Sequence, residues 1–188
     1  MSKRQPSLFA YLTLCFFGLL SFSTQVFALQ SDRNQPTKLS SNKADFDDVS
    51  QEYILQGNAK ITKGSLLIEG EKATIVVDPE GFQQITVIAP ANKPAKFSQL
   101  MDSPAGERIE GEGDVIFYDA KAETLLIKGN ASARKRQGLH WRDKLDAEEI
   151  NYDLATEKYD ALRSNNSKPV KSVLSPRIKE SNKLAIPK

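Results

Sequence analysis

The chain of 188 residues contains one cysteine, one histidine and one tryptophan. The cysteine, Cys15, lies in an apolar run near the N-terminus, so the rest of the chain must fold without disulfide bonds. The scarcity of cysteine and histidine excludes a metal centre built from several such ligands. It also leaves His140 as the only imidazole for acid–base or nucleophilic chemistry, which argues against a catalytic site of that kind.

Long apolar runs are absent except at the N-terminus. Residues 1–28 carry Lys3 and Arg4, a short apolar run, and a final "TQVFA" with small residues at Val26 and Ala28. This order is typical of a secretory signal peptide, and the apolar run is short for a transmembrane anchor. We therefore expect export and cleavage after Ala28, with a retained anchor as the alternative.

An excess of one charge sign is absent as well. The predicted signal peptide holds two of the 26 bases and none of the 24 acids, so the exported chain has no net charge. Its overall charge therefore gives no indication of nucleic-acid binding. Positive charge gathers only near the C-terminus, where the basic residues either contact anionic phosphates or keep the tail soluble. They include Lys168, Lys171, Arg177 and Lys179.

The exported part is long enough for one domain with its own apolar core. Residues 29–36 and 176–188 are rich in polar residues and proline. We expect a flexible N-terminal segment at 29–36 and a basic, disordered tail at 176–188. The domain then spans residues 37–175, and alternation of apolar and polar residues predicts its last strand at 170–174.

The domain contains an internal repeat. "YILQGNAK" at 53–60 resembles "TLLIKGNAS" at 124–132, and Gly57 and Gly129 lie 72 residues apart. Four other segments share an apolar start and an apolar or aromatic residue just before Asp: 39–47, 68–78, 109–119 and 145–153. The pattern predicts two long copies of one unit, composed of strand, turn, strand, Gly-Asn turn and strand.

Alternation of apolar and polar residues favours strands over helices in both copies. Gly57-Asn58 and Gly129-Asn130 fit corners where the backbone needs a positive φ, which Gly and Asn tolerate best. Only one face of each predicted strand is apolar, so two sheets must face each other. Composition does not decide whether the space between them is a packed core or an open groove.

Five segments of the chain occur in a recognisable order after the signal peptide. They are "QPTKLSSNKADFD", "YILQGNAKITKGSLLIEGEKA", "NKPAKFSQ", "IEGEGDVIFYDAKAETLLIKGNA" and "LDAEEINYDLATEKYDA". This ordered set resembles the LptA/OstA family of periplasmic lipopolysaccharide-transport proteins. The resemblance covers about residues 35–174, which is nearly the whole predicted domain.

The resemblance implies an all-β fold, a twisted antiparallel β-jellyroll of about sixteen strands whose two sheets form an open, V-shaped apolar trough. It implies a periplasmic carrier that bridges inner and outer membranes and shields the acyl chains of lipopolysaccharide during export. The implied partners are lipopolysaccharide, an LptC-like inner-membrane protein, an LptD-like outer-membrane protein and further copies joined head to tail. Neither catalysis nor a cofactor, metal or nucleic acid is expected.

Lipid contacts are expected on the inner face of the trough. The resemblance places them at Thr37, Leu39, Phe97, Ile116 and Tyr118, and alternation adds Tyr53, Leu55, Ile61, Ile68, Leu125 and Ile127. Ordinary core packing is the alternative interpretation at each position. Thr37 departs from the large apolar residue that is usual there, which would loosen the N-terminal end of the trough.

Unpaired strand edges at the two ends of the domain are predicted to join molecules. Residues 37–43, with Thr37, Leu39 and Ser41, would pair with the LptC-like partner. Residues 168–174, with Val170, Ser172 and Leu174, would pair with the LptD-like partner or the next copy. Pro169 lacks an N–H group and would limit pairing locally.

Two polar clusters are poor candidates for a metal or catalytic site. Around His140 the acids Asp143, Asp146, Glu148 and Glu149 alternate as the outer face of a strand would. "EGEGD" at 110–114 lacks the full ligand pattern of a calcium loop.

Two other functions remain as alternatives. A periplasmic scaffold that polymerises by strand addition and carries no lipid would have a fully packed interior. An exported β-solenoid enzyme that acts on polysaccharide would need paired carboxylates in a cleft. The acids here alternate with apolar residues, which is the pattern of an outward face.

Overall fold

The computed structural model describes residues 32–103, 106–163 and 169–176. The predicted signal peptide, Lys168 and nearly all of the predicted tail, including Arg177 and Lys179, lie outside these ranges. Within them, twelve strands form one antiparallel sheet, which confirms the expected all-β class. No helix of the described residues is long and apolar enough to cross a membrane.

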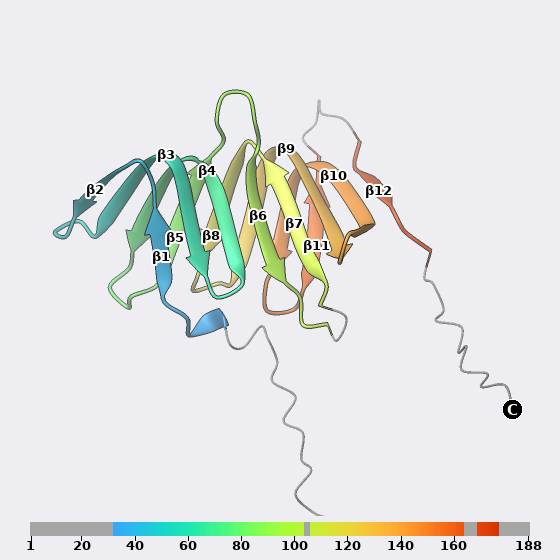
Figure 1. Cartoon of the computed structure of the whole chain (residues 1–188), viewed down its shortest axis with the longest axis horizontal. Helices are drawn as coiled ribbons and strands as arrows, with labels where there is room; N and C mark the ends of the chain where they lie inside the picture. Colours follow the sequence, from blue (N-terminus) through green and yellow to red (C-terminus); the bar gives the residue numbers. More distant parts are fainter. Residues whose placement is uncertain (1–31, 104–105, 164–168, 177–188) are drawn as a thin grey trace, which may run out of the picture.

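The strands follow the predicted alternation closely. They are β1 (Thr37–Ser40), β2 (Lys43–Asp47), β3 (Glu52–Lys63), β4 (Leu66–Val77), β5 (Gln83–Ile88), β6 (Ala95–Leu100), β7 (Arg108–Gly113), β8 (Val115–Asp119), β9 (Thr124–Gln137), β10 (His140–Asp153), β11 (Lys158–Leu162) and β12 (Lys171–Val173). Figure 1 shows them as a sandwich with β2 near one end and β12 near the other.

Four long strands connect the two layers of the sandwich. Each half of β3 pairs with a different strand, the first with β2 and the second with β1. In the same way β4 pairs with β6 and β5, β9 with β8 and β7, and β10 with β12 and β11. Each of these four strands has one half in each layer. When the halves are counted separately, the twelve strands become the expected sixteen.

We call the layer that contains β1, β6, β7 and β12 sheet I, and the layer that contains β2, β5, β8 and β11 sheet II. The long strands bend where they pass from one sheet to the other. In β3 the bend lies at Gly57 and Asn58, with φ of 75° and 51°, and in β9 at Gly129 and Asn130, with φ of 73° and 47°. The predicted Gly-Asn corners are therefore confirmed, and they form the closed side of the V.

The internal repeat is also confirmed, and it extends to six strands per copy. Strands β1–β6 form the first copy and β7–β12 the second, since their pairing patterns are the same. In β2 and β3, Phe46 lies opposite Tyr53, as Tyr118 lies opposite Leu125 in β8 and β9. The two copies meet through β6 and β7 in sheet I and through β5 and β8 in sheet II.

Apolar side chains from the inner faces of both sheets form one buried cluster. Side chains meet directly across the sandwich, because the ring centroids of Phe97 in sheet I and Tyr152 in sheet II lie 6.2 Å apart. Gly111 in β7 leaves room for the ring of Phe97, its cross-strand neighbour in sheet I, since an added Cβ would come within 2.1 Å of Phe97 Cε1. The same Cβ would come within 2.8 Å of Ile127 Cδ1 from sheet II. The two sheets are therefore tightly interlocked near the bends.

Candidate functional site

The inner face of the sandwich brings the predicted trough residues together. Eight of them belong to the buried cluster: Leu55, Ile61, Ile68, Phe97, Ile116, Tyr118, Leu125 and Ile127. Leu39 and Tyr53 are partly buried and pack against this cluster. Thr37 is partly exposed at the N-terminal end of β1, and its hydroxyl donates a hydrogen bond to Gln83 Oε1 over 2.6 Å. Their contact with lipid stays a prediction.

The middle of the sandwich is packed. Side chains from both sheets, including Ile68, Val87, Ile116 and Ile127, have no exposed surface. An acyl chain therefore cannot occupy this layer unless the two sheets move apart or the side chains rearrange.

Hairpin turns opposite the bends form the rim of the V, which we call the mouth. The turn at 64–65 and residues 101–103 lie on the sheet I side, and the turns at 120–123 and 154–157 lie on the sheet II side. The backbone N–H of Asp102 donates to Glu157 Oε1 over 2.5 Å, which joins the two sides. The contact of Thr37 with Gln83 crosses the mouth as well.

A turn at residues 32–35, which we call the N-terminal turn, forms a third contact across the mouth. The buried carboxylate of Asp32 accepts a hydrogen bond from Ser65 Oγ on the sheet I side. Arg33 forms an ion pair with Glu123 on the sheet II side. Figure 1 shows this turn just before β1, at the lower edge of the sandwich. The N-terminal turn thus ties both sides of the mouth together.

A pocket of about 190 Å³ lies beside the N-terminal turn, and we call it the mouth pocket. Besides Asp32 and Arg33, its lining includes Lys63, Leu66 and Gln99 from sheet I and Tyr118, Glu123 and Leu154 from sheet II. Burial, with a contribution from the nearby carboxylates of Glu123, Asp119 and Asp32, raises the pKa of Tyr118 to about 12. The phenol is therefore neutral at physiological pH, and the pocket combines an apolar floor with a charged rim.

The cluster around His140 is arranged as an outer strand face. His140 is exposed at the start of β10, and Trp141 stacks with Arg134, whose guanidinium carbon lies 3.9 Å from the ring centroid. Within the described ranges, no group of three or more His, Cys, Asp or Glu side chains could hold a metal ion. The tryptophan is thus engaged in a cation–π contact.

In the described part of the chain, both sheets end in free strand edges at both ends of the domain. In sheet I these are β1 and β12, which include Thr37, Leu39 and Ser172, with Ser41, Val170 and Leu174 in the flanking residues. In sheet II they are β2 and β11, which the sequence analysis missed. Among the described strands, each of these four pairs with one other strand. The end strands also expose apolar side chains: Phe46, Leu162 and Val173 are 60% to 65% exposed.

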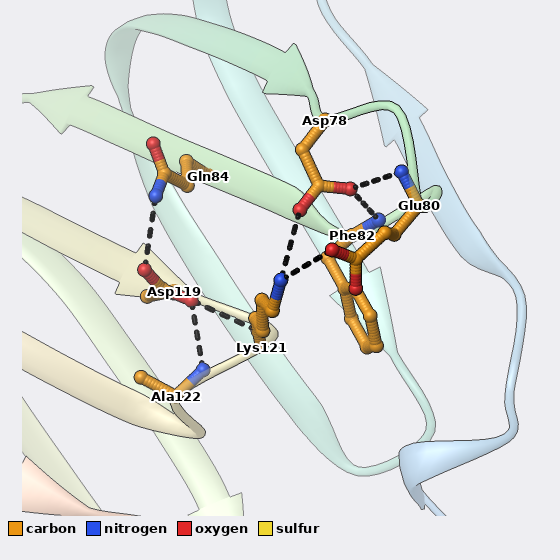
Figure 2. Close-up of polar contacts among 7 residues, drawn as sticks. All are labelled: Asp78, Glu80, Phe82, Gln84, Asp119, Lys121 and Ala122. Carbon is orange, nitrogen blue, oxygen red and sulfur yellow. Dashed lines mark hydrogen bonds and ion pairs between the residues drawn. The ribbon is translucent and has the colours of Figure 1, made fainter.

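The contact between the two copies shows how such edges join within the chain. Figure 2 shows its rim in sheet II, where Gln84 Nε2 donates to Asp119 Oδ2 over 3.0 Å. The other oxygen of Asp119 accepts from the backbone N–H groups of Lys121 and Ala122. The hydrogen bond from the backbone N–H of Ala122 contributes most to lowering the pKa of Asp119. Lys121 Nζ of the second copy donates to Glu80 Oε1 of the first over 2.8 Å, so polar contacts join the two copies.

Comparisons with known proteins give matches over most of the chain. The family described as "LptA/(LptD N-terminal domain) LPS transport protein" matches residues 38–158. The chain is 28% identical over 159 residues to the lipopolysaccharide export system protein LptA of Escherichia coli strain K12, covering 85% of this chain and 81% of that protein. It is 27% identical over 163 residues to LptH of Pseudomonas aeruginosa, covering 86% of each.

A solved structure supports the fold independently. The crystal structure of LptH from Pseudomonas aeruginosa is described as the LptA homologous periplasmic component of the conserved lipopolysaccharide transport device. It matches with a TM-score of 0.68 at 23% sequence identity, covering 78% of this chain and 99% of that one. The jellyroll architecture is therefore shared.

Proposed function

Because the chain belongs to the family of LptA and LptD N-terminal domain lipopolysaccharide-transport proteins, we propose that it is a non-enzymatic periplasmic carrier of lipopolysaccharide. In this role it bridges inner and outer membranes and shields acyl chains during their export. The observation that supports this role most is the continuous apolar layer between the sheets, from Leu39 in β1 to Ile150 in β10. Burial of acyl chains is favourable by about 0.8 kcal/mol per CH₂ group, so such a layer binds them without specific contacts.

Uptake of a lipid requires the packed interior to open. Within the described residues, the two sheets are joined covalently by the bent strands and by the connections at 41–42, 89–94 and 114, all on the closed side. The V can therefore widen at the mouth while the bends hold. The contacts that cross the mouth are polar and partly exposed, and such contacts are individually weak. Acyl chains would then replace the contacts that inner side chains such as Phe97 and Tyr118 make with each other.

Site-specific photo-crosslinking in cells tests this function. We expect a photoreactive residue at Phe97 or Tyr118 to form adducts with lipopolysaccharide, because both side chains lie on the inner face. The control is Lys72, which is exposed on the outer face of β4 and should give no lipid adduct. Blotting for lipopolysaccharide provides the readout.

The packed interior favours one rival, a periplasmic scaffold that adds strands end to end and carries no lipid. If neither inner position gives lipid adducts while probes at 37–43 and 168–174 link to other proteins, the scaffold is correct and the carrier role is excluded.

The N-terminal turn should slow lipid uptake. Replacement of Arg33 by Ala removes the ion pair with Glu123 and one of the ties across the mouth. Because an exposed ion pair adds little to global stability, we expect nearly unchanged thermal unfolding but about threefold faster binding of a fluorescent fatty acid in stopped flow. Lys38→Ala, which removes an exposed cation from the outer face of β1, is the matched control. An unchanged rate in Arg33→Ala would mean that the N-terminal turn does not restrict uptake.

The contact between the two internal copies suggests how molecules join head to tail. In this arrangement β12 and β11 of one molecule take the places of β6 and β5, and β1 and β2 of the next take the places of β7 and β8. The LptC-like partner would use the edge at β1 and the LptD-like partner the edge at β12. Both sheets, and the apolar layer between them, would then continue from one molecule to the next.

Strand pairing within the copies supports a specific register for the proposed joint. In sheet I, Phe97 lies opposite Gly111 between the copies. Ser172 of β12 is equivalent to Phe97, because Ser172 pairs with Leu145 as Phe97 pairs with Ile68. Leu39 of β1 is equivalent to Gly111, because Leu39 pairs with Ile61 as Gly111 pairs with Ala133. Ser172 of one molecule would therefore lie opposite Leu39 of the next. The same register sets Val170 opposite Ser41 and Leu174 opposite Thr37.

The edge of sheet II adds charge complementarity to the proposed joint. Lys158 takes the place of Gln84, and Asp47 takes the place of Asp119. Asp47 Oδ1 accepts from the backbone N–H groups of Val49 and Ser50, as Asp119 does in its own turn, and the bond from Ser50 lowers the pKa of Asp47 most. An ionised Asp47 of one molecule would therefore meet Lys158 of another, beside an aromatic pair of Phe46 and Tyr159.

A further inference from the structure

Gln99 is an unusual residue in the interior of this sandwich. Its side chain on β6 is 3% exposed, and its carbonyl oxygen Oε1 has no hydrogen-bond partner among the described residues. A buried acceptor without a partner is costly in a protein interior, and native structures contain few of them. An explanation is therefore needed for a polar side chain at this position.

The position of Gln99 indicates a ligand with both apolar and polar parts. Along β6 the inner face runs from Ala95 through Phe97 to Gln99, so the amide lies between the apolar floor and the mouth. It lines the mouth pocket together with the apolar side chains of Leu66 and Leu154. A group that meets Gln99 must therefore be a hydrogen-bond donor carried on an apolar body.

The rim of the mouth pocket completes the chemical description. Four charged side chains line the pocket, the cations Lys63 and Arg33 and the carboxylates Asp32 and Glu123. Arg33 is paired with Glu123, and Asp32 accepts a hydrogen bond from Ser65, so Lys63 is the lining cation that an anionic head group can approach. The pocket volume of about 190 Å³ is below the roughly 300 Å³ of a typical small-molecule site. Part of an acyl chain fits this space, whereas a whole head group does not.

We propose that the mouth pocket is a subsite for an acyl chain that carries a hydroxyl group close to its head group, with the hydroxyl donating a hydrogen bond to Gln99 Oε1. The inference rests on the proposed carrier function and adds a chemical preference to it. A β-hydroxyl lies only two carbons from the carboxyl group, so it reaches the level of Gln99 while the carboxylate stays near Lys63. The rest of the chain then continues toward Phe97 and the bends.

Tyr152 provides an internal control for this proposal. Its hydroxyl is also buried without a partner among the described residues, but the residue does not line the mouth pocket. Tyr152→Phe and Gln99→Leu therefore each remove one unpaired polar group from the interior. Only Gln99→Leu removes a group that faces the subsite.

Binding of two matched fatty acids tests the subsite. Myristate and β-hydroxymyristate, which differ only in the hydroxyl, are titrated into the wild-type domain, Gln99→Leu and Tyr152→Phe, with isothermal calorimetry as readout. We expect the wild type to bind β-hydroxymyristate about tenfold more tightly than myristate, as one buried hydrogen bond allows. Gln99→Leu should lose this preference, and Tyr152→Phe should keep it.

The outcomes separate the subsite from the carrier function. Equal affinity of the wild type for both chains, or a preference that persists in Gln99→Leu, overturns the subsite but leaves acyl-chain binding intact. Failure of the wild type to bind either chain overturns both the subsite and the lipid-carrying trough. Thermal unfolding verifies that each variant folds, and Gln99→Met, which is unbranched, replaces Gln99→Leu if the latter does not fold.

Discussion

Single-cysteine variants Ser172→Cys and Leu39→Cys are expected to combine into a disulfide-linked dimer when they are mixed under mild oxidation. The proposed joint places these residues directly opposite each other on β12 of one molecule and β1 of the next. Opposed residues of antiparallel strands have Cα atoms about 4.5 to 5.5 Å apart, which lies within the range of a disulfide. Non-reducing electrophoresis should show nearly all protein as dimer.

The only cysteine of the chain, Cys15, lies within the predicted signal peptide. A protein prepared without residues 1–28 is therefore free of other cysteines for this measurement. The matched control pairs Ser172→Cys with Lys38→Cys, since neighbouring residues of a strand point to opposite faces. That pair should link far less.

A second pair tests the other sheet. Tyr159→Cys and Phe46→Cys should also link, because the joint continues sheet II through β11 and β2. Linking of the sheet I pair alone would limit the joint to one sheet. Equal linking of the matched and shifted pairs, or no linking of any pair, would contradict the register derived from the internal repeat.

Much of the fold follows from local patterns in the sequence. Gly-Asn at 57–58 and 129–130 predicts the bends because few other residues tolerate positive φ. Period-two alternation predicts the inner faces of β3, β8 and β9, since a buried face on one side is the physical cause of that alternation. These features depend on neighbouring residues, and a sequence displays them directly.

Features that depend on distant residues do not follow from the sequence. The edges at β2 and β11 arise because the long strands change partners at their bends, and no local pattern predicts that change. Segments 68–78 and 145–153 both end in Asp, and the sequence pattern aligns Asp78 with Asp153. Strand pairing shows instead that Asp153 occupies the position in the second copy that Val76 occupies in the first. Both aspartates begin a turn by accepting backbone N–H groups, which explains the sequence similarity despite the shifted register.

The mouth illustrates the same limit at the candidate site. Arg33 and Glu123 are separated by 90 residues, and no local pattern indicates that they meet. Gln99 stands at an inner position of an alternating strand, but the sequence does not reveal that its amide oxygen lacks a partner. Such contacts depend on the relative position of two sheets, which neither strand encodes alone.

Replacement of Gly111 by Val is expected to cause the largest loss of stability among point changes on the inner face. An added Cβ would come within 2.1 Å of Phe97 Cε1 and 2.8 Å of Ile127 Cδ1, and both side chains are buried. Overpacking of this kind costs about 3 kcal/mol. In a chain of this length the midpoint of thermal unfolding, measured by circular dichroism, should fall by about 6 to 12 °C.

Glu112→Val is the matched control, because it introduces the same side chain one position along β7, where the residue is only partly buried. Its effect should stay within about 0.5 kcal/mol. If Gly111→Val proves as stable as the wild type, the sheets near the bends must separate readily. The interior would then be open to acyl chains without widening of the mouth. A large loss restricted to Gly111→Val would instead mean that the bends are rigid, so that lipid uptake has to begin at the mouth.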